Sequence, residues 1–310
     1  MPRVIDTRPE DQIELGDLVE MLETGSFDPD DEDNFASWGE ALKKLANNRR
    51  FLGELIVEEL RQSCAGTLQR SAYSPQVIVL HGGSKRFLLR ANFWPAESDS
   101  IVVNSGTDPF FYGMPHDHNF SFLTVGYIGP GYWSDYYEYD YDRVVGFAGE
   151  QVDLRFVERS RLEPGKVMLY RAHRDVHLQL PADEMSVSLN ILGISNSHEF
   201  RDQYKFDVER SRISGILNNN ALEPLVALAA HFGGEEGRGL IEDFAERHPS
   251  DRIRFTAVKA RAATAEGIDG RMAVFERAAR ADNPYVSAMA KREAERIEKG
   301  RTWIETPPAI

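Results

Sequence analysis

The chain contains almost no cysteine and no long apolar run. Cys64 is the only cysteine among 310 residues, so no intrachain disulfide can form and folding does not need an oxidising compartment. No stretch approaches the roughly 18 uninterrupted apolar residues of a transmembrane helix, and residues 1–6 lack the apolar core of a secretory signal. We therefore expect a cytoplasmic protein without a membrane partner.

Positive charge is also scarce. The chain has 36 lysines and arginines against 50 aspartates and glutamates, which gives a formal net charge of −14. A chain this acidic is poorly suited to bind nucleic acid or an anionic membrane, so we expect neither as a partner. With 42% hydrophobic residues, the chain has enough apolar material for a sizeable core.

The pattern along the chain predicts three regions. Residues 1–73 comprise an acidic segment, 1–34, that we interpret as a solvated linker or cap, followed by one or two amphipathic helices. Residues 74–200 contain short strand-like runs separated by turn residues and no helical pattern, which indicates an antiparallel barrel or sandwich. Residues 201–310 return to helical spacing. We expect them to form a helical C-terminal domain that makes a homodimer or covers the barrel.

The individual elements are predicted as follows. A hairpin joins the strands 76–81 and 85–91 through a Gly-Gly-Ser turn. Further strands are expected at 100–104, 119–128, 132–141, 143–146, 152–157, 166–170, 176–180 and 186–194. Helices are expected at 222–232, 239–247, 251–265, 271–279 and 285–299, and Ser250 or Asp251 is placed to cap the third of these. The fold class is thus mainly β with helical flanks.

Four of the eight histidines fall in two short segments. His116 and His118 lie in the first, and His173 and His177 lie in the second. Side chains at positions i and i+2 of a strand point to the same face, so His116 and His118 can converge on one point, and a histidine of the second segment can complete the set. Imidazole is a common metal ligand, and three of them leave positions open on an ion such as Fe(II). The alternative is that these are ordinary polar residues of a strand face.

The first histidine segment resembles the first motif of the cupin family. In that family a glycine precedes H-x-H, and a glutamate and a second glycine often follow. Here Gly113 precedes His116 and His118, and Gly129 or Gly131 follows. Gly113 lies closer to the histidines than the family pattern expects.

The second segment resembles the second cupin motif. Pro164 and Gly165 form the expected turn, residues 166–170 form the expected strand, and His177 follows at the expected offset. The resemblance covers residues 74–194, about 40% of the chain, and is strongest to the three-histidine, thiol-dioxygenase-like branch. It implies a cupin barrel, that is, a double-stranded β-helix.

The resemblance also implies a ligand set. His116, His118 and His177 would bind the metal, and His173 would either replace His177 or lie behind the ligands. Leu123 or its neighbour Phe122 occupies the position where many cupins have a ligand glutamate. Three neutral ligands leave the ion more electrophilic and more open than a set of four.

An alternative ligand set pairs His116 with Asp117 or Asn119, as in 2-oxoglutarate oxygenases. Such enzymes also need an arginine or lysine shortly after the distal histidine to bind the co-substrate. Residues 178–194 contain neither, which argues against this class.

Aromatic residues are dense between Phe110 and Tyr141. Such residues fill barrels through strand propensity alone, but they can also line a pocket for an organic substrate. In the second case the hydroxyl of Tyr136 would orient the substrate, and Glu138 would be the acid or base, a partner for a cation, or a fourth metal ligand. A carboxylate inside an apolar barrel has a raised pKa unless it is paired or bound to a metal.

These observations favour a non-haem Fe(II)-dependent oxygenase that acts with O₂ on a small organic or peptide substrate in an aromatic-lined barrel. A second hypothesis is a cupin that uses Zn, Mn or Ni for isomerase or hydrolase chemistry, with Glu138 as base. A third is a barrel that binds a ligand without catalysis.

Overall fold

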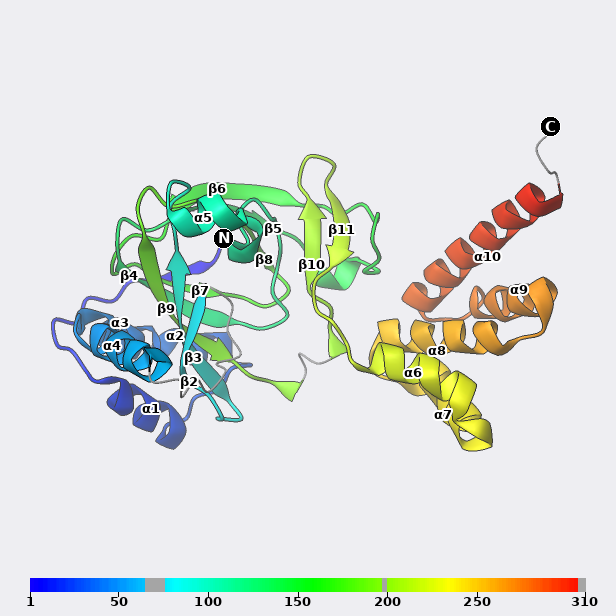
Figure 1. Cartoon of the computed structure of the whole chain (residues 1–310), viewed down its shortest axis with the longest axis horizontal. Helices are drawn as coiled ribbons and strands as arrows, with labels where there is room; N and C mark the ends of the chain where they lie inside the picture. Colours follow the sequence, from blue (N-terminus) through cyan, green and yellow to red (C-terminus); the bar gives the residue numbers. More distant parts are fainter. Residues whose placement is uncertain (65–75, 197–199, 306–310) are drawn as a thin grey trace. The chain divides into compact units, whose positions relative to one another are not determined.

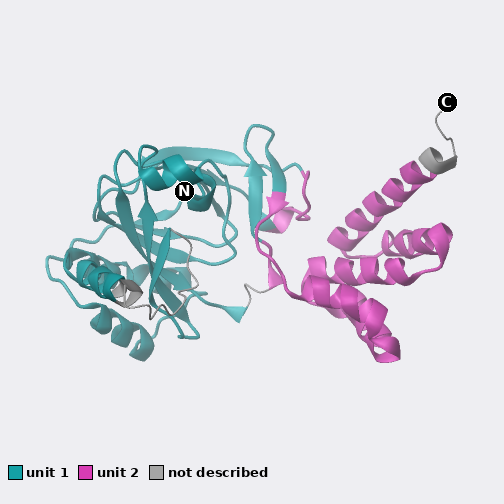
Figure 2. Cartoon of the chain, viewed as in Figure 1, with its two compact units in different colours: residues 1–141, 151–199, 203–214 teal, residues 142–150, 200–202, 215–310 magenta. Residues whose placement is uncertain are grey.

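The structure, a computed structural model, describes residues 1–64, 76–196 and 200–305 (Figure 1). The chain forms two compact units (Figure 2). One comprises residues 1–141, 151–199 and 203–214, and the other comprises 142–150, 200–202 and 215–310. The N-terminal helices therefore belong to the same unit as the strands, and they do not form the separate region that the sequence pattern suggested.

In the described part of the first unit, most strands form two antiparallel sheets. The larger sheet has the order β1-β7-β4-β9-β3-β2, with the bounds Arg3–Ile5, Val167–Tyr170, Phe122–Ile128, Ser186–Gly193, Phe87–Trp94 and Val77–His81. The smaller sheet has the order β6-β5-β8, with the bounds Arg155–Arg161, Trp133–Glu138 and Asp175–Gln179. The described strands do not join into one closed barrel. The expected cupin barrel is observed only as two antiparallel sheets.

The two faces of the larger sheet have different environments, as the alternation along β3 shows. Phe87, Leu89 and Ala91 are buried in the hydrophobic core on one side. Arg90 and Asn92, which alternate with them, line a cavity on the other side. Because successive strand residues point to opposite faces, a single strand separates the apolar core from the polar cavity.

Four helices complete the core on the apolar face. They are α1 (Leu15–Thr24), α2 (Glu32–Ser37), α3 (Gly39–Asn47) and α4 (Phe51–Cys64). Buried side chains of residues 18–52 share one hydrophobic cluster with β3, β4, β7 and β9. The interpretation of residues 1–34 as a solvated linker or cap is therefore wrong. Its acidic residues are mostly exposed, but Leu18, Leu22 and Phe27 between them are at most 3% exposed.

Several further elements differ from the sequence prediction. The segment expected as a strand at 100–104 is the helix α5 (Ser100–Ser105), and the strand expected at 143–146 is replaced by a 3-10 turn, η2 (Tyr141–Arg143). A second 3-10 turn, η1, spans Asp108–Phe110. After residue 200 the chain forms a two-stranded sheet, β10 (Tyr204–Asp207) and β11 (Arg212–Ile216), before it becomes helical.

The second unit is helical, as predicted. Its helices are α6 (Leu222–Phe232), α7 (Gly234–Arg247), α8 (Asp251–Thr264), α9 (Gly267–Ala278) and α10 (Pro284–Glu305). The side chain of Ser250 accepts a hydrogen bond from the backbone N–H of Ile253 at 3.4 Å, which confirms it as the cap of α8. None of the helices in the described part of the chain combines the length and the apolar character needed to cross a membrane.

Candidate metal centre

The backbone around the three histidines is held by hydrogen bonds between distant segments. His116 exchanges two backbone hydrogen bonds with His177 on β8, at 3.1 and 3.0 Å. The carbonyl of His118 accepts a hydrogen bond from the N–H of His173 at 2.8 Å. These contacts fix both histidine segments in register across about 60 residues of sequence, and so they determine where the rings lie.

The rings of His116, His118 and His177 converge on one point. The Nε2 atoms of His118 and His177 are 3.0 Å apart, and those of His177 and His116 are 3.2 Å apart. Three nitrogens at about 2.1 Å from one ion, at right angles to each other, are about 3.0 Å apart, and in tetrahedral geometry they are about 3.4 Å apart. The observed spacing therefore fits three ligands on one face of a divalent metal ion.

All three imidazoles are in the state that binds metal. Burial lowers the pKa of His116 from 6.5 to about 4. Burial also lowers the pKa values of His118 and His177 well below the usual value, and the neighbouring histidines lower them further. The rings are therefore neutral near pH 7. The Nδ1 of His116 lies 2.8 Å from the carbonyl oxygen of Met114 and donates to it, which leaves the Nε2 lone pair directed at the shared point.

His173 does not belong to this group. Its backbone has a φ of 59°, and its ring packs against Tyr141 with 4.2 Å between ring centroids. The left-handed conformation places His173 in the turn before β8 and directs its ring away from the other three. The structure thus groups His177 with His116 and His118, and gives His173 a supporting role through its backbone N–H.

Asp117 and Asn119, the alternative ligands, are also absent from the three-histidine group. Asp117 is fully buried, and its two carboxylate oxygens accept hydrogen bonds at 2.5 Å from the hydroxyl of Tyr139 and the backbone N–H of Tyr204. Asp117 therefore lies in the interior and not on the surface. Because it lies between His116 and His118 and points the other way, it anchors their backbone from behind.

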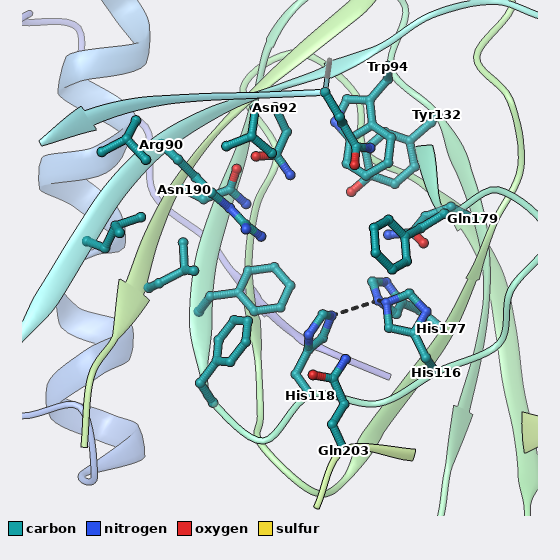
Figure 3. A pocket seen from close by; sticks show the side chains of 18 residues that line it. Arg90, Asn92, Trp94, His116, His118, Tyr132, His177, Gln179, Asn190 and Gln203 are labelled. Atoms are coloured by element: carbon teal, nitrogen blue, oxygen red, sulfur yellow. Dashed lines mark hydrogen bonds between the residues drawn. The ribbon is translucent and has the colours of Figure 1, made fainter. Parts of the chain in front are cut away.

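The histidines open onto a cavity of about 480 Å³ between the two sheets (Figure 3). Apolar and aromatic side chains form much of its wall, namely those of Trp94, Phe111, Phe120, Phe122, Leu88 and Leu192. Phe122 occupies the expected glutamate position, with its ring centroid 4.9 Å from that of His118. Leu123 faces the opposite core. The ligand set has no carboxylate at this position.

The wall opposite the histidines is polar (Figure 3). Arg90 and Asn92 of β3 and Asn190 of β9 line it, and Arg90 and Asn190 are direct partners in the β3–β9 register. These residues were not among the site residues expected from the sequence. The signal was present, since Arg90 and Asn92 are two positions apart within the apolar run 87–94 and mark a strand face that is not packed in a core.

The two predicted catalytic residues do not line the cavity. Tyr136 is fully buried behind it. Its hydroxyl is 2.8 Å from that of Tyr170, whose ring centroid is 5.0 Å from that of His177. Burial raises the pKa of Tyr136 to about 12. A buried, neutral hydroxyl that is paired with Tyr170 supports the ligand His177 from behind and does not reach a substrate in the cavity.

Glu138 lies in an ion-pair cluster at the end of β5. Its carboxylate is 2.6 Å from the amino group of Met1, 2.8 Å from Arg155, 3.2 Å from Arg171 and 3.7 Å from Arg174. Burial alone would raise its pKa, but the hydrogen bond and charge of the Met1 amine and the charges of Arg174 and Arg171 lower it. The placement of Glu138 as acid or base at the metal is thus corrected, because the carboxylate is held ionised and outside the cavity.

Comparisons with known proteins give weak similarities. No family model and no curated protein matches the chain. Similar solved structures include DMSP lyase DddQ from Ruegeria pomeroyi, with 11% identity, a TM-score of 0.25 and coverage of 63% of this chain and 77% of that one. A cupin domain from Bordetella pertussis has 14% identity and a TM-score of 0.23, over 40% of this chain and all of that one. The structure of the DMSP lyases RdDddP and RnDddQII has 13% identity and a TM-score of 0.23, over 38% of this chain and only 46% of that one. These values do not establish a family, so the chemistry must follow from the site itself.

Proposed function

We propose that this chain is a metal-dependent oxygenase of the non-haem Fe(II) type, with His116, His118 and His177 as the metal ligands. The observation that carries the proposal is the convergence of three neutral imidazoles, with Nε2 separations of 3.0 and 3.2 Å, at the wall of a 480 Å³ cavity. When bound, Fe(II) would supply a centre at which O₂ and an organic substrate can be brought together and O₂ reduced. If both oxygen atoms enter the substrate, no separate reductant is required.

The residues of the chain would hold the substrate and control its surroundings. Phe111 packs near the ring of His116, and Phe120 and Phe122 pack near the ring of His118, so these side chains would make the surroundings of the reacting groups less polar. Polar side chains on the opposite wall would orient the substrate so that one end faces the ligands. Behind the ligands, the carbonyl of Met114 and the ring of Tyr170 hold His116 and His177 in place.

The residues that line the cavity also help to decide between an oxygenase and the alternative isomerase or hydrolase. Isomerase or hydrolase chemistry with Zn, Mn or Ni requires a general acid or base within hydrogen-bond reach of the substrate. Among the described residues that line the cavity there is no aspartate or glutamate. Glu138, the predicted base, is held in ion pairs elsewhere. The site therefore favours chemistry that occurs at the metal over chemistry that depends on a carboxylate base.

The test begins with metal content. The protein is purified without an affinity tag, loaded anaerobically with Fe(II) and analysed for bound iron, together with His118→Ala and the control His231→Ala. His231 lies on α6 and is exposed. We expect about one equivalent of iron in the wild type and in the control, and little in His118→Ala.

A second measurement tests for open coordination positions. Nitric oxide, a stable analogue of O₂, is added to the iron-loaded protein, and the high-spin iron–nitrosyl signal is recorded by electron paramagnetic resonance. A strong signal that a bound organic substrate perturbs supports the oxygenase. If iron binds but nitric oxide does not, the oxygenase is ruled out. If no metal binds, the proposed function is overturned, and ligand binding without catalysis is the hypothesis to test next.

A further inference from the structure

Arg90 is a positive charge that the protein itself does not neutralise. Its side chain points from β3 into the cavity (Figure 3), and its Nε is buried without a hydrogen-bond partner. No ion pair connects its guanidinium to a carboxylate among the described residues. Burial lowers its pKa to about 10, so it stays charged near neutral pH. Arg90 as a whole is half-buried, and a cation held partly away from water without a partner is costly and therefore uncommon.

The other residues that line the cavity indicate what kind of ligand would neutralise the charge of Arg90. Among the described lining residues, Arg90 is the only one with a permanent charge, so the counter-charge has to come from a ligand. The side-chain oxygens of Asn92 and Gln179 are also buried and without partners. Both can accept hydrogen bonds from a hydroxyl or amine. The unpaired groups together fit a ligand that has one negative charge and at least one donor.

Arg90 is also close to the metal ligands. Its charge contributes to the lowered pKa of His118, and Figure 3 shows the two side chains entering the same cavity from opposite walls. A group held by Arg90 would therefore leave the remainder of a small molecule beside the three histidines. Aromatic side chains of the cavity wall, including Phe122 and Trp94, provide apolar contact for that remainder.

We propose that Arg90 binds the carboxylate of a small organic acid that also carries a hydroxyl or amine. A single planar guanidinium matches a carboxylate in charge and geometry. The inference rests on the proposed function, because the acid would be the molecule that reacts at the metal. The carboxylate can belong to the substrate itself or to a 2-oxo acid co-substrate, for which Arg90 would be the cationic anchor that residues 178–194 lack.

The experiment measures carboxylate binding on metal-free protein, so that it does not depend on iron. The probes are mandelate, which has a ring, a hydroxyl and a carboxylate, and mandelamide, which has the same shape without the charge. A third probe, 2-oxoglutarate, distinguishes the two sources of the carboxylate. Binding is measured by isothermal titration calorimetry for the wild type, Arg90→Gln and the control Arg8→Gln, whose arginine side chain is 89% exposed.

We expect the wild type and Arg8→Gln to bind mandelate at least about tenfold more tightly than mandelamide, and Arg90→Gln to lose this preference. Tighter binding of 2-oxoglutarate would assign the carboxylate to a co-substrate, and tighter binding of mandelate to a substrate. Equal binding of mandelate and mandelamide by the wild type, or no binding of any probe, overturns the proposal even if Arg90→Gln does not fold. If the preference is found but no metal binds, the proposed function fails and this inference stands.

Discussion

The three buried histidines predict an unusual dependence of stability on pH in the metal-free protein. His116 is 3% exposed and its pKa is lowered to about 4, with burial as the main cause. In the unfolded chain the same ring takes up a proton near pH 6.5. Between these two values the unfolded state binds a proton that the folded state does not. Acidification therefore favours unfolding.

This difference in proton binding sets the sign and the size of the change in unfolding free energy with pH. The stability from keeping His116 neutral is fully present above about pH 6.5, declines as the pH falls, and is lost near pH 4. The difference between the pKa of His116 in the folded and in the unfolded state corresponds to about 3 kcal/mol of unfolding free energy. His118 and His177 act in the same direction, since both have lowered pKa values. Because domain stabilities are commonly about 5–15 kcal/mol, this loss is large.

The assay is urea unfolding of the metal-free protein at several pH values between 7 and 4, for the wild type, His116→Gln and the control His231→Gln. Carboxylates titrate equally in all three, so the difference between variants reports His116 together with its effect on the pKa values of His118 and His177. We expect His116→Gln to reduce the slope of unfolding free energy against pH by up to about 1.4 kcal/mol per pH unit. Identical slopes in the wild type and His116→Gln would refute the reasoning, because His116 would then titrate alike in both states.

Three further substitutions test the surroundings of the site. Asp117→Asn should lower the unfolding free energy, measured by urea unfolding, by about 1–3 kcal/mol, because the backbone N–H of Tyr204 loses a charged acceptor. The same substitution should weaken metal binding, measured by metal titration, about tenfold. Tyr136→Phe removes the hydrogen bond to Tyr170. It should cost about 1 kcal/mol and leave metal stoichiometry unchanged by elemental analysis. Glu138→Gln should lower the melting temperature by only about a few degrees and also leave metal content unchanged; loss of metal would restore Glu138 as part of the site.

The local elements were predictable because their signals are local. The hairpin at residues 77–94, the alternation along the strands, the helices after residue 222 and the cap at Ser250 are all set by spacing and by residue type over a few positions. The segment 100–105 was mistaken for a strand because β-branched residues occur there. In the structure it forms a short helix, which the residue types alone did not indicate.

The site was predictable only in part. The i and i+2 spacing of His116 and His118 is a property of any strand, so their common direction could be derived from the sequence. The choice of His177 over His173 depended on the turn before β8, where His173 adopts a positive φ. A single residue in this conformation redirects the side chain, and no composition or period reveals it.

The sequence by itself determined the class of secondary structure, the absence of an intrachain disulfide and the first two metal-ligand candidates. Only the tertiary structure decided that residues 1–52 close the apolar core, that Glu138 is neutralised by cations from distant segments, and that Arg90 faces the histidines across the cavity. The physical reason is that burial and charge pairing depend on which segments meet in space. β3 and β8 lie more than 80 residues apart in sequence, and they share a cavity only after the sheets have assembled.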